Sequence, residues 1–281
     1  MSAIARAFNT YNFPAIVAPN GDGALPGGQN VCLIHGKGIC DALSWMDLPC
    51  GPCDMAMTAH VTVMELGPDD PCYLLVACRF DQSIEPESLL SPSLCPIGGV
   101  VEQTAALIWE IGITSLRRFV VAALTQPHAA LGYWTAPASL GHHHNFSGGL
   151  AQHSLEVATM VASSTALPQE DRDVAIALAI LHDYGKIWCY ENGKYTSACK
   201  RGHVLIGLEK LLPLLGSLHR HSPAIANTME ELLGGRSQRT DRRYPLAVGR
   251  IVNAFDQFSC ERARQRADTR QTKSDFDYVP Y

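Results

Sequence analysis

The sequence predicts an α+β protein in which a small β-rich module precedes an all-α helical bundle. In the first 90 or so residues, short runs alternate apolar and polar side chains, whereas later segments place apolar residues three and four positions apart. Seven of the ten cysteines precede residue 96, and nine of the eleven histidines follow residue 127. We therefore expect a β-rich module over residues 1–95, a helical domain over residues 96–262 and a mobile tail over residues 263–281.

The β-rich module is expected to contain a hairpin. Residues 55–66, MAMTAHVTVMEL, alternate in polarity, the turn residues GPDDP follow, and residues 72–80, CYLLVACRF, form a second β-rich run. NVCLIHGKG, residues 30–38, indicates an earlier strand. Residues 1–30 are rich in Gly, Pro and Asn, have no clean period, and are expected to be extended or loose. The segment SIEPESLLSPSLCP, residues 83–96, is typical of a linker.

Seven helices are expected after the linker. Gly112 and Pro127 end the first two segments, and each segment carries its apolar residues on one face. The expected helices cover residues 100–112, 115–126, 149–164, 170–185, 202–215, 222–234 and 244–265. The residues that follow lack an apolar stripe, so we expect them to form the tail.

Composition limits the classes of protein to consider. Charged residues make up 17% of the chain, and no apolar run approaches the roughly 18 residues of a membrane span. The N-terminus has no signal-like segment, so we expect a cytoplasmic protein with no membrane partner. The cysteines are interpreted as reduced thiols, with a small zinc site at Cys50 and Cys53 as the less favoured alternative. The net charge of −5 gives no overall attraction for nucleic acid, so any nucleic-acid binding would depend on local basic patches.

A metal site is predicted where a His–Asp pair ends the very apolar segment VAIALAILHDYGK. Adjacent helix positions point about 100° apart, so His182 and Asp183 can take two positions around one ion. His153 lies on a preceding helix and Asp256 on a following one, and other helices are expected to complete the shell. Imidazole and carboxylate donors suit Mn, Fe, Zn or Co, and Mg less well, so the identity of the divalent ion stays open.

The reaction expected of such a site is phosphoester hydrolysis, because a divalent ion activates water and polarises a phosphoryl oxygen. Lys186 follows His182 by four residues and would share its helical face, where it could contact a phosphate oxygen. Gly185 is an alternative end for this helix. A single buried histidine is more often a core residue than a ligand. The order H…HD…D over several helices, with GK after the pair, favours a metal site.

Two stretches resemble a known family. HHHNFSGGLAQHSLEVA, residues 142–158, and AILHDYGKI, residues 179–187, are similar to the HD-domain superfamily of metal-dependent phosphohydrolases. The resembling branch includes YhaM-type 3′-to-5′ exoribonucleases and MobH-type conjugative relaxases, and the resemblance covers roughly residues 113–260. It implies an HD-domain helical bundle with an OB-like β-barrel ahead of it, a barrel type that binds single strands. The implied metal ligands are His153, His182, Asp183 and Asp256.

The resemblance also implies roles for other side chains. Asp183, Lys186 and His203 correspond to catalytic positions, and in two-metal members the residue at His203 helps to hold a second ion or the substrate. His143 and His144 correspond to residues that contact substrate or support the ligands, with surface histidines in a Gly-rich loop as the alternative.

One departure from the family concerns the number of ions. The relatives carry HHG where this chain has LLGG at residues 232–235. This loss favours one firmly held ion and leaves open a weaker second ion near His203. Arg239 and Arg242, in the segment RTDRRYP, are the expected substrate-facing cations. A solvated charged face is the alternative for both arginines.

The leading functional hypothesis is a metal-dependent phosphodiesterase that acts on single-stranded RNA or DNA, in the manner of a 3′-to-5′ exonuclease. One alternative is hydrolysis of a small nucleotide, which the pI of about 6.1 favours. Another is a DNA-processing module associated with conjugation or mobile elements, with little hydrolysis of its own. The sequence leaves the metal, the nucleic acid and the oligomeric state open.

Overall fold

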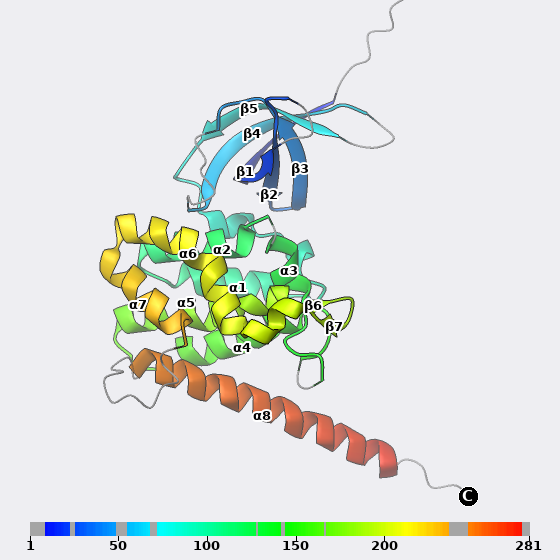
Figure 1. Ribbon diagram of the computed structural model, residues 1–281, viewed down its shortest axis with the longest axis vertical. Helices are drawn as coiled ribbons and strands as arrows, with labels where there is room; N and C mark the ends of the chain where they lie inside the picture. Colours follow the sequence, from blue (N-terminus) through cyan, green and yellow to red (C-terminus); the bar gives the residue numbers. More distant parts are fainter. Residues whose placement is uncertain are drawn as a thin grey trace, which may run out of the picture.

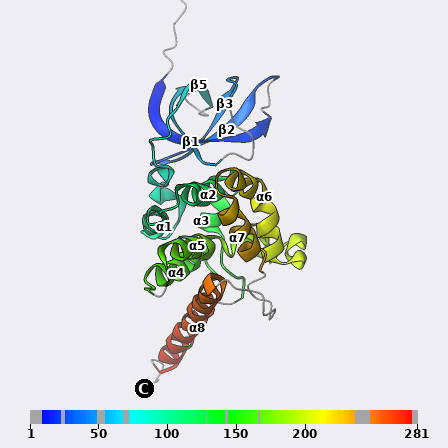
Figure 2. The same ribbon diagram turned by 90° about the vertical axis from the view of Figure 1, so that its left-hand side faces the viewer.

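A computed structural model of the chain describes residues 9–22, 26–48, 55–67, 72–127, 129–141, 144–165, 167–235 and 247–276. A β-barrel lies at one end of the molecule and the helices lie at the other (Figures 1 and 2). The predicted α+β class is therefore confirmed. No helix in the described ranges is long and apolar enough to cross a membrane.

Five strands form a closed barrel in the order β1-β2-β3-β5-β4. Neighbouring strands are antiparallel except for the parallel pair of β3 and β5. Val61, Val63 and Leu75 face the barrel core, which explains the alternating pattern of the predicted hairpin. The strands are β1 (Thr10–Asp22), β2 (Gln29–His35), β3 (Gly38–Ser44), β4 (Met57–Glu65) and β5 (Tyr73–Phe80).

Residues 1–30 were expected to be extended or loose, and within their described part the chain is extended and ordered: β1 occupies Thr10–Asp22 and pairs with both β2 and β4. Its alternation is hidden because both faces of the strand are buried. Ala15 and Val17 point into the barrel core, whereas Ile16 between them packs against the core of the helical domain. Three consecutive apolar residues therefore replace the period of two that marks a half-buried strand.

The barrel and the helices share a continuous apolar contact. Cys32 and Ile34 of β2 join Ile16 on the outer face of the barrel, where they belong to the same buried cluster as the helices. Burial raises the pKa of the Cys32 thiol to about 12, so the thiol stays protonated. The cluster continues through two short 3-10 turns, η1 (Pro86–Leu89) and η2 (Pro92–Leu94).

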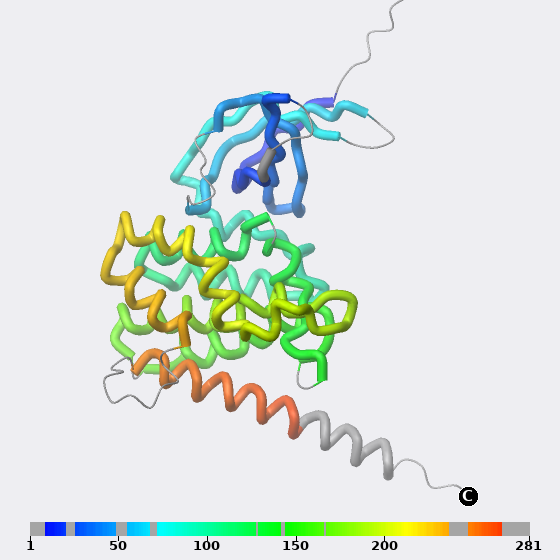
Figure 3. The backbone as a smooth tube through the Cα atoms, in the orientation of Figure 1, coloured from blue at the N-terminus to red at the C-terminus, as the bar shows by residue number. Residues whose placement is uncertain are grey.

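The helical domain is built around α5, whose residues 173–181 are all buried. Figure 3 follows the backbone and shows α8 crossing one side of the domain, on the far side from the barrel. Helices α4 and α5 pack against each other and both contact α8. The helices are α1 (Val100–Trp109), α2 (Thr114–Thr125), α3 (Ala130–Thr135), α4 (Gly149–Ala162), α5 (Gln169–Leu181), α6 (His203–His221), α7 (Pro223–Leu233) and α8 (Ala247–Phe276).

Two parts of the helical domain differ from the expected pattern. Between α5 and α6 the chain forms η3 (Tyr184–Trp188), a hairpin of two short strands, and η4 (Ser197–Arg201). The short strands are β6 (Tyr190–Glu191) and β7 (Lys194–Tyr195). Neither this hairpin nor the short helix α3 was predicted from the sequence. Each is too short to carry a periodic signal of its own.

The last helix is longer than expected, because α8 continues to Phe276, within the segment 263–281 that was expected to form the tail. The extension needs no apolar face to be helical. Residues 261–272, ERARQRADTRQT, contain many strong helix formers and neither Gly nor Pro. A missing apolar stripe indicates that a segment does not enter the core, but it does not indicate that the segment lacks secondary structure.

Candidate metal centre

Three helices bring the four predicted ligands together. His153 lies within α4, Asp256 lies within α8, and His182 is the C-cap residue that directly follows α5. The backbone leaves the α-helix at Asp183, which has φ −101° and ψ 10°, before η3 begins. The His–Asp pair therefore occupies a helix end that faces two other helices.

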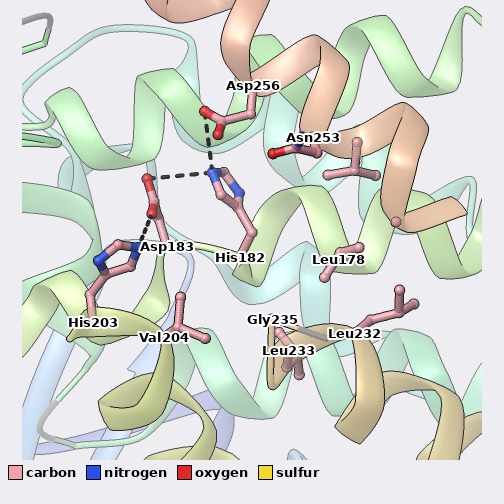
Figure 4. A pocket seen from close by; sticks show the side chains of 12 residues that line it. Leu178, His182, Asp183, His203, Val204, Leu232, Leu233, Gly235, Asn253 and Asp256 are labelled. Atoms are coloured by element: carbon pink, nitrogen blue, oxygen red, sulfur yellow. Dashed lines mark ion pairs between the residues drawn. The ribbon is translucent and has the colours of Figure 1, made fainter. Parts of the chain in front are cut away.

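The four side chains converge on one small region (Figure 4 shows three of them). Nε2 of His153 lies 3.0 Å from Oδ1 of Asp256 and 3.7 Å from Oδ2 of Asp183. Nε2 of His182 lies 3.4 Å from Oδ2 of Asp183 and 3.8 Å from Oδ1 of Asp256. One donor atom from each of His153, His182 and Asp183 lies within 4.8 Å of the other two, so one ion can contact all three.

The ring of His182 is oriented for metal binding. Its Nδ1 lies 2.8 Å from the carbonyl oxygen of Ala179. Because a carbonyl only accepts hydrogen bonds, Nδ1 carries the proton and Nε2 has a free lone pair. Nε2 of His182 is buried and makes no hydrogen bond of good geometry within the described part of the chain. A buried nitrogen lone pair between two carboxylates fits a divalent cation, which would satisfy all of these groups.

Burial and neighbouring charges shift the pKa values of the residues in the site. Burial would raise the pKa of Asp183, but His182, Lys186 and His203 outweigh it and hold that pKa well below its usual range. Burial lowers the pKa of His153, whereas in His182 the nearby Asp183 and Asp256 overcome burial and raise the pKa. The carboxylates are thus ionised at neutral pH, as metal ligands must be.

Lys186 and His203 both contact Asp183. Nζ of Lys186 lies 2.5 Å from Oδ2 of Asp183, and Nε2 of His203 lies 3.2 Å from Oδ1. The helix does not continue to Lys186, as a shared helical face would require, because α5 ends at Leu181. The 3-10 turn of η3 nevertheless returns Lys186 to the same carboxylate. Lys186 from η3 and His203 from the start of α6 therefore contact opposite oxygens of Asp183.

Gly185 allows this arrangement through a close approach of two backbones. A Cβ atom at Gly185 would overlap with the carbonyl oxygen of His203 and contact the backbone nitrogen of Gly207, 2.5 Å away. Any larger residue would push η3 away from the start of α6. The absence of a side chain at Gly185 thus sets the distance between Asp183 and His203.

A cavity of about 80 Å³ opens beside the carboxylates. His182, Asp183, His203 and Asp256 form its polar wall, and Asn253, one turn before Asp256, adds an amide (Figure 4). The rest of the lining is mostly apolar: Leu178, Val204, Leu232, Leu233, Gly235, Gly249 and Val252. The cavity therefore offers a reacting group charged side chains on one side and a largely dry surface on the other.

Other predicted residues have different placements. His144 is buried and does not line the cavity; its Nε2 lies 3.2 Å from Oε1 of Glu156. Of the two roles expected for it, this placement favours support of the ligands. The predictions for His143, Arg239 and Arg242 fall outside the described residues.

Several residues around the predicted ligands were not anticipated from the sequence. Asn253 lines the cavity, and Ser259 lies 3.2 Å from Nδ1 of His153. The thiol of Cys260 donates to Oδ1 of Asp256 over 3.5 Å. All three lie three or four residues from Asp256, so the helical spacing around a predicted ligand was the signal that would have found them.

The geometry agrees with comparisons to known proteins. Residues 150–260 match the family model described as the HD domain. Over 183 residues the chain is 25% identical to the dihydroneopterin 2′,3′-cyclic phosphate phosphodiesterase of Methanocaldococcus jannaschii, covering 55% of this chain and 74% of that protein. It is 26% identical over 125 residues to the 3′-5′ exoribonuclease YhaM of Bacillus subtilis, covering 44% of this chain and 39% of that protein.

A third relative is the 3′-5′ exoribonuclease YhaM of Listeria monocytogenes, which is 30% identical over 89 residues, or 31% of this chain and 28% of that protein. The chain thus spans less than two fifths of either exoribonuclease. The matched family region contains all four of the converging side chains. Residues 150–260 of the chain therefore match the HD domain, and this match supports a metal-dependent phosphohydrolase.

Proposed function

We propose that the protein is a metal-dependent phosphodiesterase that acts on single-stranded nucleic acid, with the polarity of a 3′-to-5′ exonuclease. The observation that carries the proposal is the convergence of His153, His182, Asp183 and Asp256 beside the cavity. These four residues would hold one divalent ion, whether Mn, Fe, Mg, Zn or Co. Because His203 lies on the far oxygen of Asp183, it would contribute to a second, weaker site.

A divalent ion bound there would supply an activated water and Lewis acidity toward a phosphoryl oxygen. The protein's own groups prepare the remaining interactions. Lys186 forms an ion pair with Asp183, and its ammonium group would bind a phosphate oxygen of a substrate held beside that carboxylate. His203 is half-exposed and would bind another phosphate oxygen or the leaving oxygen. The apolar wall of the cavity would exclude water from the reacting phosphate.

A groove on the barrel favours single-stranded nucleic acid as the substrate. A groove of about 1170 Å³ runs along the start of β1, the turn between β2 and β3, and the start of β5. Its lining includes Tyr11, Phe13, His35, Lys37 and Tyr73. The rings of Phe13 and His35 lie 4.6 Å apart, and Tyr11 is 45% exposed. Aromatic rings beside a lysine form a surface on which bases stack while the backbone is neutralised.

Hydrolysis of a small nucleotide is the second candidate. It is favoured by the similarity to a protein named for a 2′,3′-cyclic phosphate substrate and by the small cavity at the carboxylates. A cyclic phosphodiester has the same bond type as a strand, so the same residues would serve. The two candidates differ in whether the barrel takes part in binding.

The test compares the two substrates directly. Mn²⁺-loaded protein is incubated with 5′-labelled RNA, with 5′-labelled DNA and with 2′,3′-cyclic mononucleotides. We expect the oligomers to shorten stepwise from the 3′ end. Asp183→Asn should be inactive, whereas Asp171→Asn, an exposed carboxylate on α5, should act like the wild type. Turnover of cyclic nucleotides without cleavage of either oligomer would contradict the proposal in favour of the second candidate.

A further inference from the structure

A chain of hydrogen bonds runs from His144, in the segment that precedes α4, to the metal centre. Nε2 of His144 lies 3.2 Å from Oε1 of Glu156, and Oγ of Ser259 donates to Oε2 of Glu156 over 2.8 Å. The same Ser259 oxygen lies 3.2 Å from Nδ1 of His153. Ser259 and His153 are 2% and 0% exposed, so water does not replace these contacts.

We propose that Glu156 is a positioning residue of the metal centre: acting through Ser259, it fixes His153 in the tautomer that presents the Nε2 lone pair to the ion. His144 holds Glu156 in place. The proposal rests on the metal site of the proposed function, and it concerns how one ligand of that site is prepared. It assigns a purpose to His144, which does not line the cavity.

The direction of each hydrogen bond follows from the groups involved. An ionised carboxylate only accepts hydrogen bonds, so Ser259 must donate its hydroxyl proton to Glu156. The oxygen of Ser259 then has only lone pairs left for His153, and Nδ1 of His153 must carry the proton. By the same reasoning, Nε2 of His144 donates to Glu156.

These directions require Glu156 to be ionised. Its burial would raise the pKa, but hydrogen bonds from His144 and Ser259 outweigh it and lower the pKa of Glu156 to about 2. Gln152 adds a further donor, with Nε2 3.3 Å from Oε1. The carboxylate is therefore charged at any pH at which the enzyme would be assayed, and the chain of hydrogen bonds keeps one direction.

The backbone is shaped to keep His144 over Glu156. His144 has φ 52°, in the left-handed region that side chains seldom adopt, and its carbonyl accepts from the backbone nitrogen of Ala138 over 2.9 Å. A Cβ atom at Gly149 would overlap with the same carbonyl oxygen. Gly148, with φ 85°, makes the turn into α4. Local strain at His144 is thus held by its surroundings, as expected for a residue that orients another.

Once His153 has this tautomer, its Nε2 atom can act as a metal ligand. Nε2 of His153 then directs a lone pair at Oδ1 of Asp256, 3.0 Å away, and two electron-rich atoms at that distance need a cation between them. The negative charge of Glu156, relayed by Ser259, also makes Nε2 a stronger donor. Loss of either residue should weaken metal binding without altering any ligand.

The test measures metal affinity rather than activity. Zn²⁺ and Mn²⁺ titrations of the full chain compare the wild type with Ser259→Ala, Glu156→Ala and the double variant, with Glu261→Ala, an exposed glutamate on α8, as the control. We expect each single variant to bind roughly 10- to 100-fold more weakly. Because Glu156 acts through Ser259, the double variant should bind no more weakly than Ser259→Ala. Additive losses would overturn the relay, since they would mean independent structural effects.

A second readout does not depend on metal binding. Nitrogen-15 NMR of the histidine rings reports which nitrogen of His153 is protonated, with the resonance assigned by its loss in His153→Asn. The wild type should show a protonated Nδ1 with and without metal, and Glu156→Ala should show a mixture of tautomers. An unchanged Nδ1 proton in Glu156→Ala would refute the proposal. Absence of metal binding by the wild type, with the tautomer effect intact, would instead count against the proposed function alone.

Discussion

Nε2 of His153 lies 3.0 Å from Oδ1 of Asp256, although 103 positions separate the two residues in the chain. Helix α4 supplies the imidazole and α8 supplies the carboxylate. Two further residues link the same helices: Ser259 of α8 contacts His153 and donates a hydrogen bond to Glu156 of α4. The candidate metal centre therefore depends on the contact between these two helices as well as on the end of α5.

Replacement of Asp183 should remove the metal and the activity together. Asp183 is 4% exposed and faces His153, His182 and His203, so its loss removes charge from the centre of the ligand set. In Asp183→Ala we expect metal content to fall below stoichiometric levels and turnover to be undetectable, as measured by elemental analysis and a phosphodiesterase assay. Full metal occupancy in this variant would show that Asp183 is not a ligand.

Replacement of Lys186 should separate catalysis from metal binding. Lys186 contacts Asp183 but offers no lone pair to a metal while it is protonated. In Lys186→Ala we expect nearly unchanged metal content and a fall in kcat on the order of 100-fold, as when a donor that stabilises transition-state charge is lost. Lys194→Ala, at an exposed position of β7, is the matched control. A large loss of metal in Lys186→Ala would mean that the lysine acts mainly on the charge of Asp183.

Stability should depend on pH through Glu156. Its pKa is lowered to about 2 in the folded protein, below the value of about 4.3 expected when unfolded. The ionised form therefore stabilises the fold fully above about pH 4.3, and this contribution is lost as pH falls toward 2. Urea unfolding of metal-free protein should show the wild type more stable than Glu156→Gln at pH 6, with the difference shrinking by pH 3. A constant difference would show that the charge contributes nothing.

Two glycines should respond to alanine in opposite ways. In Gly185→Ala the new methyl group would overlap with the backbone of His203, so we expect a loss of about 1–3 kcal/mol in unfolding free energy and weaker metal binding. Gly216 lies within α6, and a methyl group added to it would meet no atom within 4 Å. Gly216→Ala should therefore gain about 0.5–1 kcal/mol. Calorimetry measures both, and equal effects would contradict the close approach at Gly185.

The barrel groove should matter for strands and not for small substrates. Tyr11 is an exposed aromatic residue in the groove, whereas Trp45 is an exposed aromatic residue of the barrel outside it. Stacking of one base contributes about 1–3 kcal/mol, so Tyr11→Ala should weaken oligonucleotide binding about 10-fold or more. Fluorescence anisotropy would measure this, and Trp45→Ala should bind normally. Unchanged binding in Tyr11→Ala would remove the groove from the proposed strand path.

The sequence by itself determined the fold class and the chemical character of the site. Alternation and helical spacing report which faces of β4, β5 and α5 are buried, because these faces repeat along one element. His182 and Asp183 stood out because a polar pair ending an apolar helix requires a partner. For the same reason the pattern failed at β1, where opposite faces of the strand enter two different cores.

Only the tertiary structure decided which side chains meet across elements. The order of residues in the chain does not indicate that Ser259 of α8 lies between His153 and Glu156 of α4, or that Gly185 brings η3 onto His203. These contacts depend on how closely helices pack, and that distance is set by the shapes of all the side chains between them. The types of the proposed ligands were therefore readable from the sequence, whereas their orientation comes from packing.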